Sequence, residues 1–204
     1  MKKSLILAAF AAAGLVFAEE PLLKNGGFET TQKTPKGVHK YIQDQVKNGW
    51  DLGLGPIASY PKEWLPNGGK GKIRMIVTGE NEETGENVHS GKQSMYIEAQ
   101  GGHLMNEASL KPGKYEFSCW VKGAGSVKFA AYCGGIDKET KRPKNFRTIL
   151  FFTESFDSPS KWIQLKKVCE IGTNVPGVTM FSIAFCGDKG TYYIDDVELK
   201  PVTK

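Results

Sequence analysis

The chain has 204 residues, with 27 basic and 22 acidic side chains and a formal net charge of +5. These charges occur without runs, so the sequence lacks the clustered Lys and Arg with which proteins bind nucleic acid. The 24 glycines and 10 scattered prolines favour many turns over long helices. The length suits one domain with a sizeable core.

The first 18 residues have the features of a secretory signal peptide. Lys2 and Lys3 precede a run of small and apolar residues that is too short to span a bilayer. Val16 and Ala18 stand at positions −3 and −1 of a cleavage site, and an uncleaved anchor is the alternative. We therefore expect a secreted or periplasmic bacterial protein with no membrane insertion after cleavage, and one mature domain over residues 19–204.

The mature chain has the pattern of short strands separated by turns. Tyr115, Phe117, Cys119 and Val121 alternate with more polar residues and would share one face of a strand. A glycine-containing turn is expected at 123–125. Eight such strands are expected, at 94–99, 103–110, 115–121, 127–133, 146–156, 162–171, 178–186 and 191–199.

Eight antiparallel strands at this spacing predict an all-β fold, an antiparallel β-sandwich of the jelly-roll type. In that topology strands one, eight, three and six form one sheet, and strands two, seven, four and five form the other. Residues 31–88 are too long for a single loop and are expected to form an insertion, with edge strands within 50–77. The insertion is either functional or decorative.

Four cysteines, an even number, are compatible with disulfide bonds in an exported protein. The jelly-roll order makes the pairs Cys119–Cys186 and Cys133–Cys169 the easiest, although the spacing of the sheets can forbid either pair. Free buried thiols are the alternative. The spacing of cysteines and histidines is not that of a zinc site.

Motifs of catalysis are missing from the sequence. The three histidines have no recognisable motif around them, and neither a nucleophile elbow nor a phosphate loop occurs. A glycosidase needs two carboxyl groups across a cleft, and no such pair can be identified. A non-enzyme is therefore expected.

A ligand-binding face is expected on the neighbouring strands 127–133 and 178–186. Apolar residues of one parity on these strands face the core, so residues of the other parity face outward. Small residues there leave room for a ligand, and an aromatic ring can stack on the apolar face of a sugar. The candidate residues are Lys128, Tyr132, Met180 and Ser182, with His103 and Arg147 at the borders.

Tyr60 and Trp64 lie in the long insertion, close to prolines and glycines. Exposed loop aromatics would indicate a ligand contact. The alternative is a hydrophobic plug that pins the insertion to the sandwich.

Five short motifs occur in the order found in the carbohydrate-binding modules of families four, nine and twenty-two. They are residues 25–29 (NGGFE), 48–52 (NGWDL), 90–94 (SGKQS), 112–115 (PGKY) with Trp120, and 193–197 (YIDDV). The chain resembles these secreted, galactose-binding-like modules along almost its whole mature length. The resemblance implies a jelly roll with a sugar-binding groove, to which His103, Tyr132 and Ala184 correspond, and a structural calcium with Glu29 and Asp195 as ligands. Relatives have a tryptophan where this chain has 100–103 (QGGH), which implies weaker stacking.

The residues around the expected calcium are compatible with that ion. Calcium takes six to eight oxygen ligands, and two glycines before Glu29 let nearby carbonyl groups turn toward one point. Asp195 shares the parity of Tyr193, Val197 and Leu199, so its charge is expected to face inward, where it needs a partner. Hydrogen bonding of Asp195 by backbone amides or by a lysine is the alternative to calcium.

The sequence thus predicts a non-catalytic extracellular protein that binds a polysaccharide or oligosaccharide, without nucleic acid, as a monomer. A cell-surface structural or adhesion protein that binds other proteins is the second hypothesis. A jelly-roll glycoside hydrolase or lyase is the third.

Overall fold

The computed structural model describes residues 21–33, 44, 47, 50–51, 59–67, 70–77, 85–100, 103–106, 108, 110–136, 139, 143–172, 178–185 and 190–202. The expected signal peptide lies outside these residues. Most of the 34–58 part of the expected insertion at 31–88 also lies outside them. Strands dominate the described part. The elements are β1 (Thr31–Lys33), β2 (Trp50–Asp51), β3 (Ser59–Pro61), β4 (Trp64–Asn67), β5 (Lys70–Val77), the 3-10 helix η1 (Gly85–Asn87), β6 (Gln93–Gln100), β7 (His103–Asn106), β8 (Gly113–Ile136), β9 (Pro143–Ile171), β10 (Val178–Phe185) and β11 (Gly190–Pro201).

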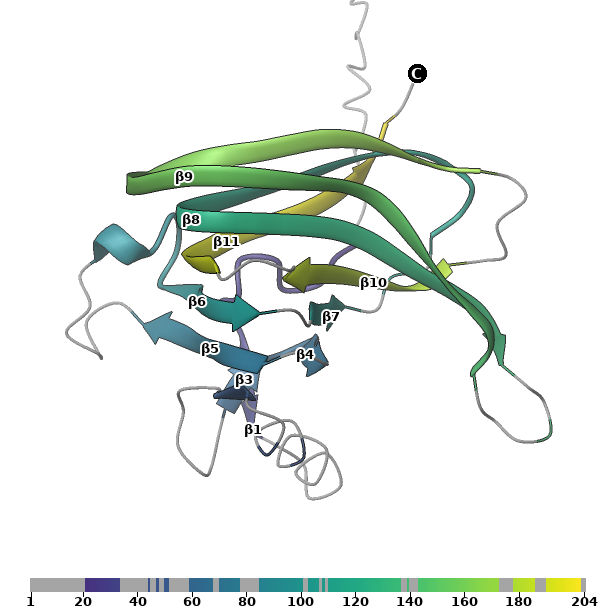
Figure 1. The fold of residues 1–204 in the computed structure, drawn as a ribbon, viewed down its shortest axis with the longest axis horizontal. Coiled ribbons are helices and arrows are strands. Elements are labelled where there is room, and N and C mark those ends of the chain that lie inside the picture. The colour runs from purple at the N-terminus through teal and green to yellow at the C-terminus, as the bar shows by residue number, and fades with distance from the viewer. Residues whose placement is uncertain are drawn as a thin grey trace, which may run out of the picture.

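The long strand β8 belongs to both layers of the sandwich. Its first part pairs with β11, its second part pairs with β10, and β9 follows it along both parts. The ring centroids of Phe117 and Phe129 lie 3.4 Å apart, although an extended strand between these residues would span ~40 Å. β8 therefore folds back on itself, and its halves face each other across the core. In Figure 1 the ribbons of β8 and β9 double back at the left-hand end.

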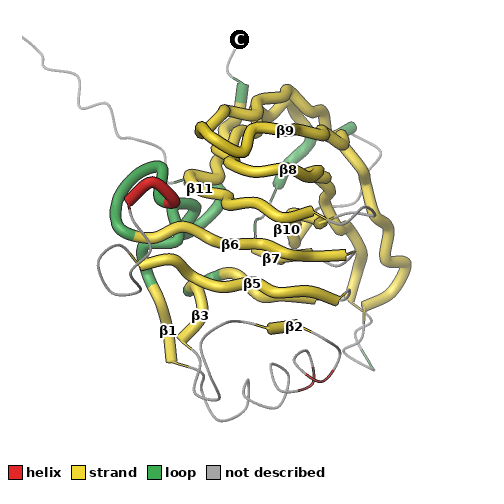
Figure 2. Tube along the Cα trace, turned by 60° about the vertical axis from the view of Figure 1, so that its left-hand side comes forward, coloured by secondary structure: helices red, strands yellow, loops and turns green. Residues whose placement is uncertain are grey.

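Two antiparallel layers result from this fold-back. One layer has the order β5-β6-β11-β8-β9, with β2 added in parallel at its edge, and the other has the order β4-β7-β10-β8-β9. In Figure 2 the strands of the two layers run in similar directions across the view. The fold is an antiparallel β-sandwich with the strand order expected of a jelly roll, and β5 and β4 extend its layers at their edges. A separate two-stranded sheet pairs β1 with β3.

The expected turn at 123–125 is instead a bend within β8. Gly123 has a φ of 125°, and a Cβ there would lie 2.5 Å from the carbonyl oxygen of Thr191. Only glycine fits this backbone and this close approach. The hydrogen-bonded ladder therefore continues through the bend, with a register shift between Val121 and Gly123.

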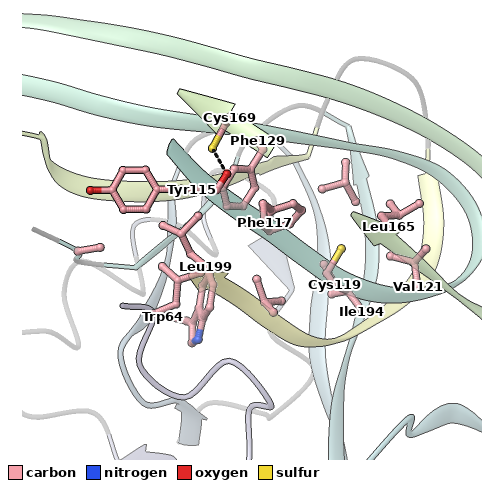
Figure 3. Close-up of a cluster of buried hydrophobic side chains, with 14 of the residues drawn as sticks. Trp64, Tyr115, Phe117, Cys119, Val121, Phe129, Leu165, Cys169, Ile194 and Leu199 are labelled. Carbon is pink, nitrogen blue, oxygen red and sulfur yellow. Dashed lines mark hydrogen bonds between the residues drawn. The ribbon is translucent and has the colours of Figure 1, made fainter. Parts of the chain in front are cut away.

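The core lies between the layers and contains the residues of expected inward parity. Phe117, Cys119 and Val121 are fully buried, and Tyr115 is nearly so. Figure 3 shows these side chains together with Phe129 from the second half of β8. The alternation read from the sequence is therefore confirmed on this strand.

Cys119 and Cys169 are both free and buried, so the disulfide pairs expected for them are absent. Cys133 pairs in register with Arg147 in one layer and Cys169 pairs with Tyr115 in the other. Facing layers lie ~10 Å apart, which is farther than the ~7 Å between Cα atoms that a disulfide spans. The Cys169 thiol instead donates to the carbonyl oxygen of Tyr115 at 3.4 Å (Figure 3). Burial raises the pKa of Cys169 to about 11 and that of Cys119 further.

Candidate functional site

The register brings most of the expected ligand-binding positions together on the layer that contains β10. Across β10 and β8, Met180 pairs with Tyr132, Ser182 with Ala130, and Ala184 with Lys128. On the other side of β10, Ala184 pairs with His103 of β7. The backbone positions of His103, Lys128, Tyr132, Met180 and Ser182 therefore form one contiguous area, called here the β10 face.

Small residues occupy the centre of the β10 face. Ala130 follows the core residue Phe129 and has the opposite parity, yet it is only 2% exposed. Lys128, two positions before Ala130, is half-buried. Leu150 is the register partner of Ala130 on β9 and is 53% exposed. Ala130 is therefore covered by its neighbours, and the register places larger residue types around this small one.

Two further candidates lie away from this row. Arg147 pairs with Cys133, one position off the pair that Tyr132 makes with Thr148. Tyr60 lies in β3 and pairs with Gln32 of β1, in the separate two-stranded sheet. The register thus leaves Arg147 next to the β10 face and places Tyr60 outside it.

Trp64 is a core residue. Its side chain is fully buried, its Nε1–H donates to the carbonyl oxygen of Asn25 at 2.8 Å, and its ring lies 5.4 Å from that of Phe28. Asn25 also donates to the carbonyl oxygens of Thr30 and Lys62, each at 2.8 Å. Trp64 therefore pins the insertion to the sandwich, which is the alternative role considered for it, and its ring is closed to a ligand.

Asp195 is held by backbone amides. The side chain is fully buried, and its Oδ2 accepts from the N–H groups of His89 at 3.0 Å and Ser90 at 3.2 Å. Its Oδ1 accepts from the N–H of Asp196 at 2.8 Å. Burial, and next the charge of Asp196, raise the pKa of Asp195 to about 7 against the effect of these donors. The backbone hydrogen bonds considered for Asp195 are therefore present.

The Asp195 side chain was expected to face the core together with Tyr193, Val197 and Leu199, and this prediction is wrong for Asp195 and Tyr193. Tyr192 and Ile194 face the core, followed by Val197 and Leu199. A bulge between Asp195 and Glu198 shifts the alternation, and Asp196 has a φ of 46°. Asp195 is therefore buried beneath residues 89–90, on the side of β11 opposite the core.

Glu29 accepts hydrogen bonds from residues 92–93, which follow the residues 89–90 bound by Asp195. Its Oε1 accepts from the N–H groups of Lys92 at 2.8 Å and Gln93 at 3.1 Å, and its carbonyl oxygen accepts from Gln93 Nε2 at 3.0 Å. The carbonyl oxygen of Gly26 accepts from the N–H of Val197 at 3.0 Å. These hydrogen bonds join residues 26–29, residues 89–93 and β11 into one unit, called here the terminal junction.

The oxygen atoms nearest to Glu29 suggest a different second ligand for a cation. A Cβ on Gly27 would lie 3.3 Å from Asp196 Oδ1 and 3.9 Å from Glu29 Cγ, so this glycine lies next to both side chains. Gln93 Oε1 is buried and has no hydrogen-bond partner. Glu29 and Asp196 are therefore the carboxylates, and Gln93 the amide oxygen, that would hold a hard cation here. Among the described residues, no group of three or more His, Cys, Asp and Glu is arranged for a metal ion.

An aromatic cluster covers the terminal junction and was not predicted. The His89 ring stacks on Trp120 with centroids 3.9 Å apart and contacts the edge of Trp162 at 5.6 Å. His89 Nδ1 lies 2.7 Å from Asp196 Oδ2, and Ser90 Oγ donates to Asp196 Oδ1 at 2.8 Å. The outward parity of Trp120 was the available sequence signal, whereas the position of His89 depends on a loop.

The helices in the described part of the chain include none long and apolar enough to cross a membrane. No protein-family model and no curated protein matches the chain.

The β-sandwich is similar to solved structures at low identity. One is the CBM22-1–GH10 part of the Clostridium thermocellum xylanase 10B with xylohexaose, with 16% identity over 69% of this chain and 26% of that one, and a TM-score of 0.48. The CBM22-1 xylan-binding domain of Paenibacillus barcinonensis Xyn10C has 17% identity over 70% and 88% of the chains, and a TM-score of 0.47. TmCBM61 with β-1,4-galactotriose has 16% identity over 89% and 99%, and a TM-score of 0.47. This chain thus spans about a quarter of the xylanase structure, and its function is argued below from its own residues.

Proposed function

We propose that this protein binds polysaccharide chains on the β10 face. The observation that carries the proposal is the register there, which sets small residues in the centre and larger polar or aromatic residues around them. Small residue types at the centre leave room for a sugar chain, which also needs a ring to stack on and side chains to hydrogen-bond its hydroxyl groups.

The expected residues that lie on the β10 face have distinct roles in this binding. Tyr132 supplies the stacking ring, and Lys128 and Ser182 supply hydrogen-bonding groups beside it. His103 in β7 marks the border of the face, and methionine, the residue type at position 180, makes adaptable apolar contacts. These roles follow from residue type and register position.

The binding is proposed to be non-catalytic. His89, Ser90 and Asp196 are residue types of a hydrolase triad, but the Ser90 hydroxyl donates to Asp196 and not to the imidazole. A triad needs the hydroxyl on the imidazole, which takes up its proton. The three residues instead hold the terminal junction.

A structural calcium at the terminal junction is part of the proposal. Glu29, Asp196 and Gln93 would hold it, with carbonyl oxygens or water completing the shell. The ion would stabilise the junction and take no part in sugar binding. We also propose that the protein is exported, on the basis of residues 1–18.

A second candidate function is adhesion to proteins at a cell surface. Two large apolar side chains on β9, Leu150 and Val168, are 53% and 60% exposed. β9 pairs only with β8 in the described sheet. A pull-down that recovers envelope proteins, with no glycan bound by the same preparation, would favour this function.

Affinity electrophoresis tests the proposed function. The mature protein is run in native gels containing xylan, β-glucan, mannan or pectin, and retardation by at least one of them is expected. Lys128→Ala should reduce the retardation. Lys166→Ala, which removes an exposed lysine paired with Glu116 on the other layer, should leave it unchanged. Absence of retardation on all four polymers contradicts the proposal.

A further inference from the structure

The outer face of the other layer carries aromatic side chains where a sandwich ordinarily has polar ones. Tyr96 of β6 and Tyr193 of β11 are register partners with ring centroids 5.3 Å apart and ring planes 59° apart. Both side chains are half-buried. Tyr192 and Ile194 of the same strand fill the core, so Tyr193 lies on the opposite side.

The row continues across the next two strands. Tyr193 pairs with Lys122 of β8. Trp162 of β9 lies beside Lys122, because its Nε1–H and Lys122 Nζ donate to the same carbonyl oxygen of Glu86, at 3.1 Å and 2.9 Å. With neighbouring strands about 4.8 Å apart, these four residues extend over roughly 14 Å. Tyr96, Tyr193, Lys122 and Trp162 are called here the tyrosine row.

The tyrosine row differs from the neighbouring aromatic cluster in its contacts. Trp120 is covered by the stacked ring of His89 and therefore has a structural task, the fixing of residues 85–90. Trp162 takes part in that task through its edge contact with His89 and its bond to Glu86. The two tyrosine rings contact each other across the strands, outside that stack. They form a tilted pair of half-buried rings on this face.

The charged side chains around the two tyrosines indicate which class of ligand would bind there. Lys122 gives the row a positive charge, and Tyr96 donates to Oε2 of the neighbouring Glu98 at 3.3 Å. Thr191, which is exposed, pairs with Glu98 across the strands. Charges of both signs give no field suited to a polyanion. Ring faces edged by hydroxyl, carboxylate and ammonium groups match the apolar faces and hydroxyl edges of neutral pyranose rings.

From this arrangement we infer that the tyrosine row is a second glycan-binding surface, on the face of the sandwich opposite the β10 face. The inference rests on the proposed function and extends it to two sites per molecule. A protein with a site on each outer face can join two polysaccharide chains or bind one polymer with increased avidity.

Calorimetry and turbidity test the inference with variants of the mature protein. The probe is an oligosaccharide prepared from whichever of the neutral polymers xylan, β-glucan or mannan retards the protein. The wild type is expected to bind two oligosaccharides per chain and to make the polymer solution turbid. Tyr96→Ala combined with Tyr193→Ala should bind one and lose the turbidity. The Tyr96→Phe, Tyr193→Phe pair keeps the rings and should retain the second site.

The control variants separate this inference from the proposed function. Lys128→Ala combined with Tyr132→Ala should remove the other site and leave the tyrosine row able to bind one oligosaccharide. A stoichiometry of one in the wild type, unchanged by the paired tyrosine-to-alanine substitutions, overturns the second site while the first remains. Wild-type protein that binds none of the four polymers used in the gels overturns both. Melting curves of every variant show whether a loss of binding comes from unfolding.

Discussion

The fold-back of β8 predicts that two residues far apart on one strand are energetically coupled. Phe117 and Phe129 are both fully buried, with ring centroids 3.4 Å apart. Each Phe→Ala substitution alone should destabilise the protein by about 3–5 kcal/mol, since it removes a buried ring and leaves a cavity. The double variant should lose about 1 kcal/mol less than the sum, because the ring contact can be lost only once. Urea denaturation of the four proteins measures this difference.

The control for this cycle is Val168, which is 60% exposed on β9. Val168→Ala should change the stability by less than about 0.5 kcal/mol and add to Phe117→Ala without coupling. Each single phenylalanine variant should melt roughly 6–20 °C lower, given about 2–4 °C per kcal/mol for a domain of this size. Additive effects of Phe117→Ala and Phe129→Ala would refute the packing of one half of β8 on the other.

Three further predictions concern the terminal junction, a hydroxyl group and the thiols. Excess chelator should lower the melting temperature, calcium should restore it, and Asp196→Ala should remove the difference; identical curves with and without chelator would disprove the cation. Tyr115→Phe should cost about 1–2 kcal/mol in urea denaturation, because its hydroxyl donates at 2.6 Å and accepts at 3.1 Å. Tyr192→Phe, whose hydroxyl lies 3.4 Å from its acceptor, should cost less, and equal losses would argue against this account. Iodoacetamide at pH 8 should leave Cys119 and Cys169 unmodified in the folded protein, because burial covers both sulfurs and raises both pKa values; rapid labelling seen by peptide mapping would contradict it.

The strand order could be predicted because it depends on alternation and spacing. Phe117, Cys119 and Val121 alternate with more polar residues, and burying them requires a particular face of β8. Once the parity of the strands is known, a jelly roll leaves few ways to pair them. These signals are local and survive in a single sequence.

The contacts of the terminal junction could not be predicted because they depend on irregular backbone. The bulge after Asp195 and the positive φ of Asp196 change which side chains of β11 face the core. Alternation assumes a regular strand, so it placed Asp195 with Val197 and Leu199. The stack of His89 on Trp120 likewise requires the path of residues 85–90, which no periodic pattern encodes.

The burial of Trp64 shows a similar limit. Its position in a proline-containing segment is equally compatible with a surface aromatic and with a core residue. The choice is made by Asn25, whose carbonyl oxygen accepts the indole N–H at 2.8 Å. That partner is distant in the sequence, so only the folded chain identifies it.

The central claim is that the β10 face binds polysaccharide. Titration calorimetry of the mature protein and of its Lys128→Ala, Tyr132→Ala variant, with the glycan that retards the protein in gels, tests it most directly. The account predicts that the variant loses one of the binding events of the wild type while its melting temperature stays within a few degrees. Unchanged stoichiometry and affinity in the folded variant would contradict it.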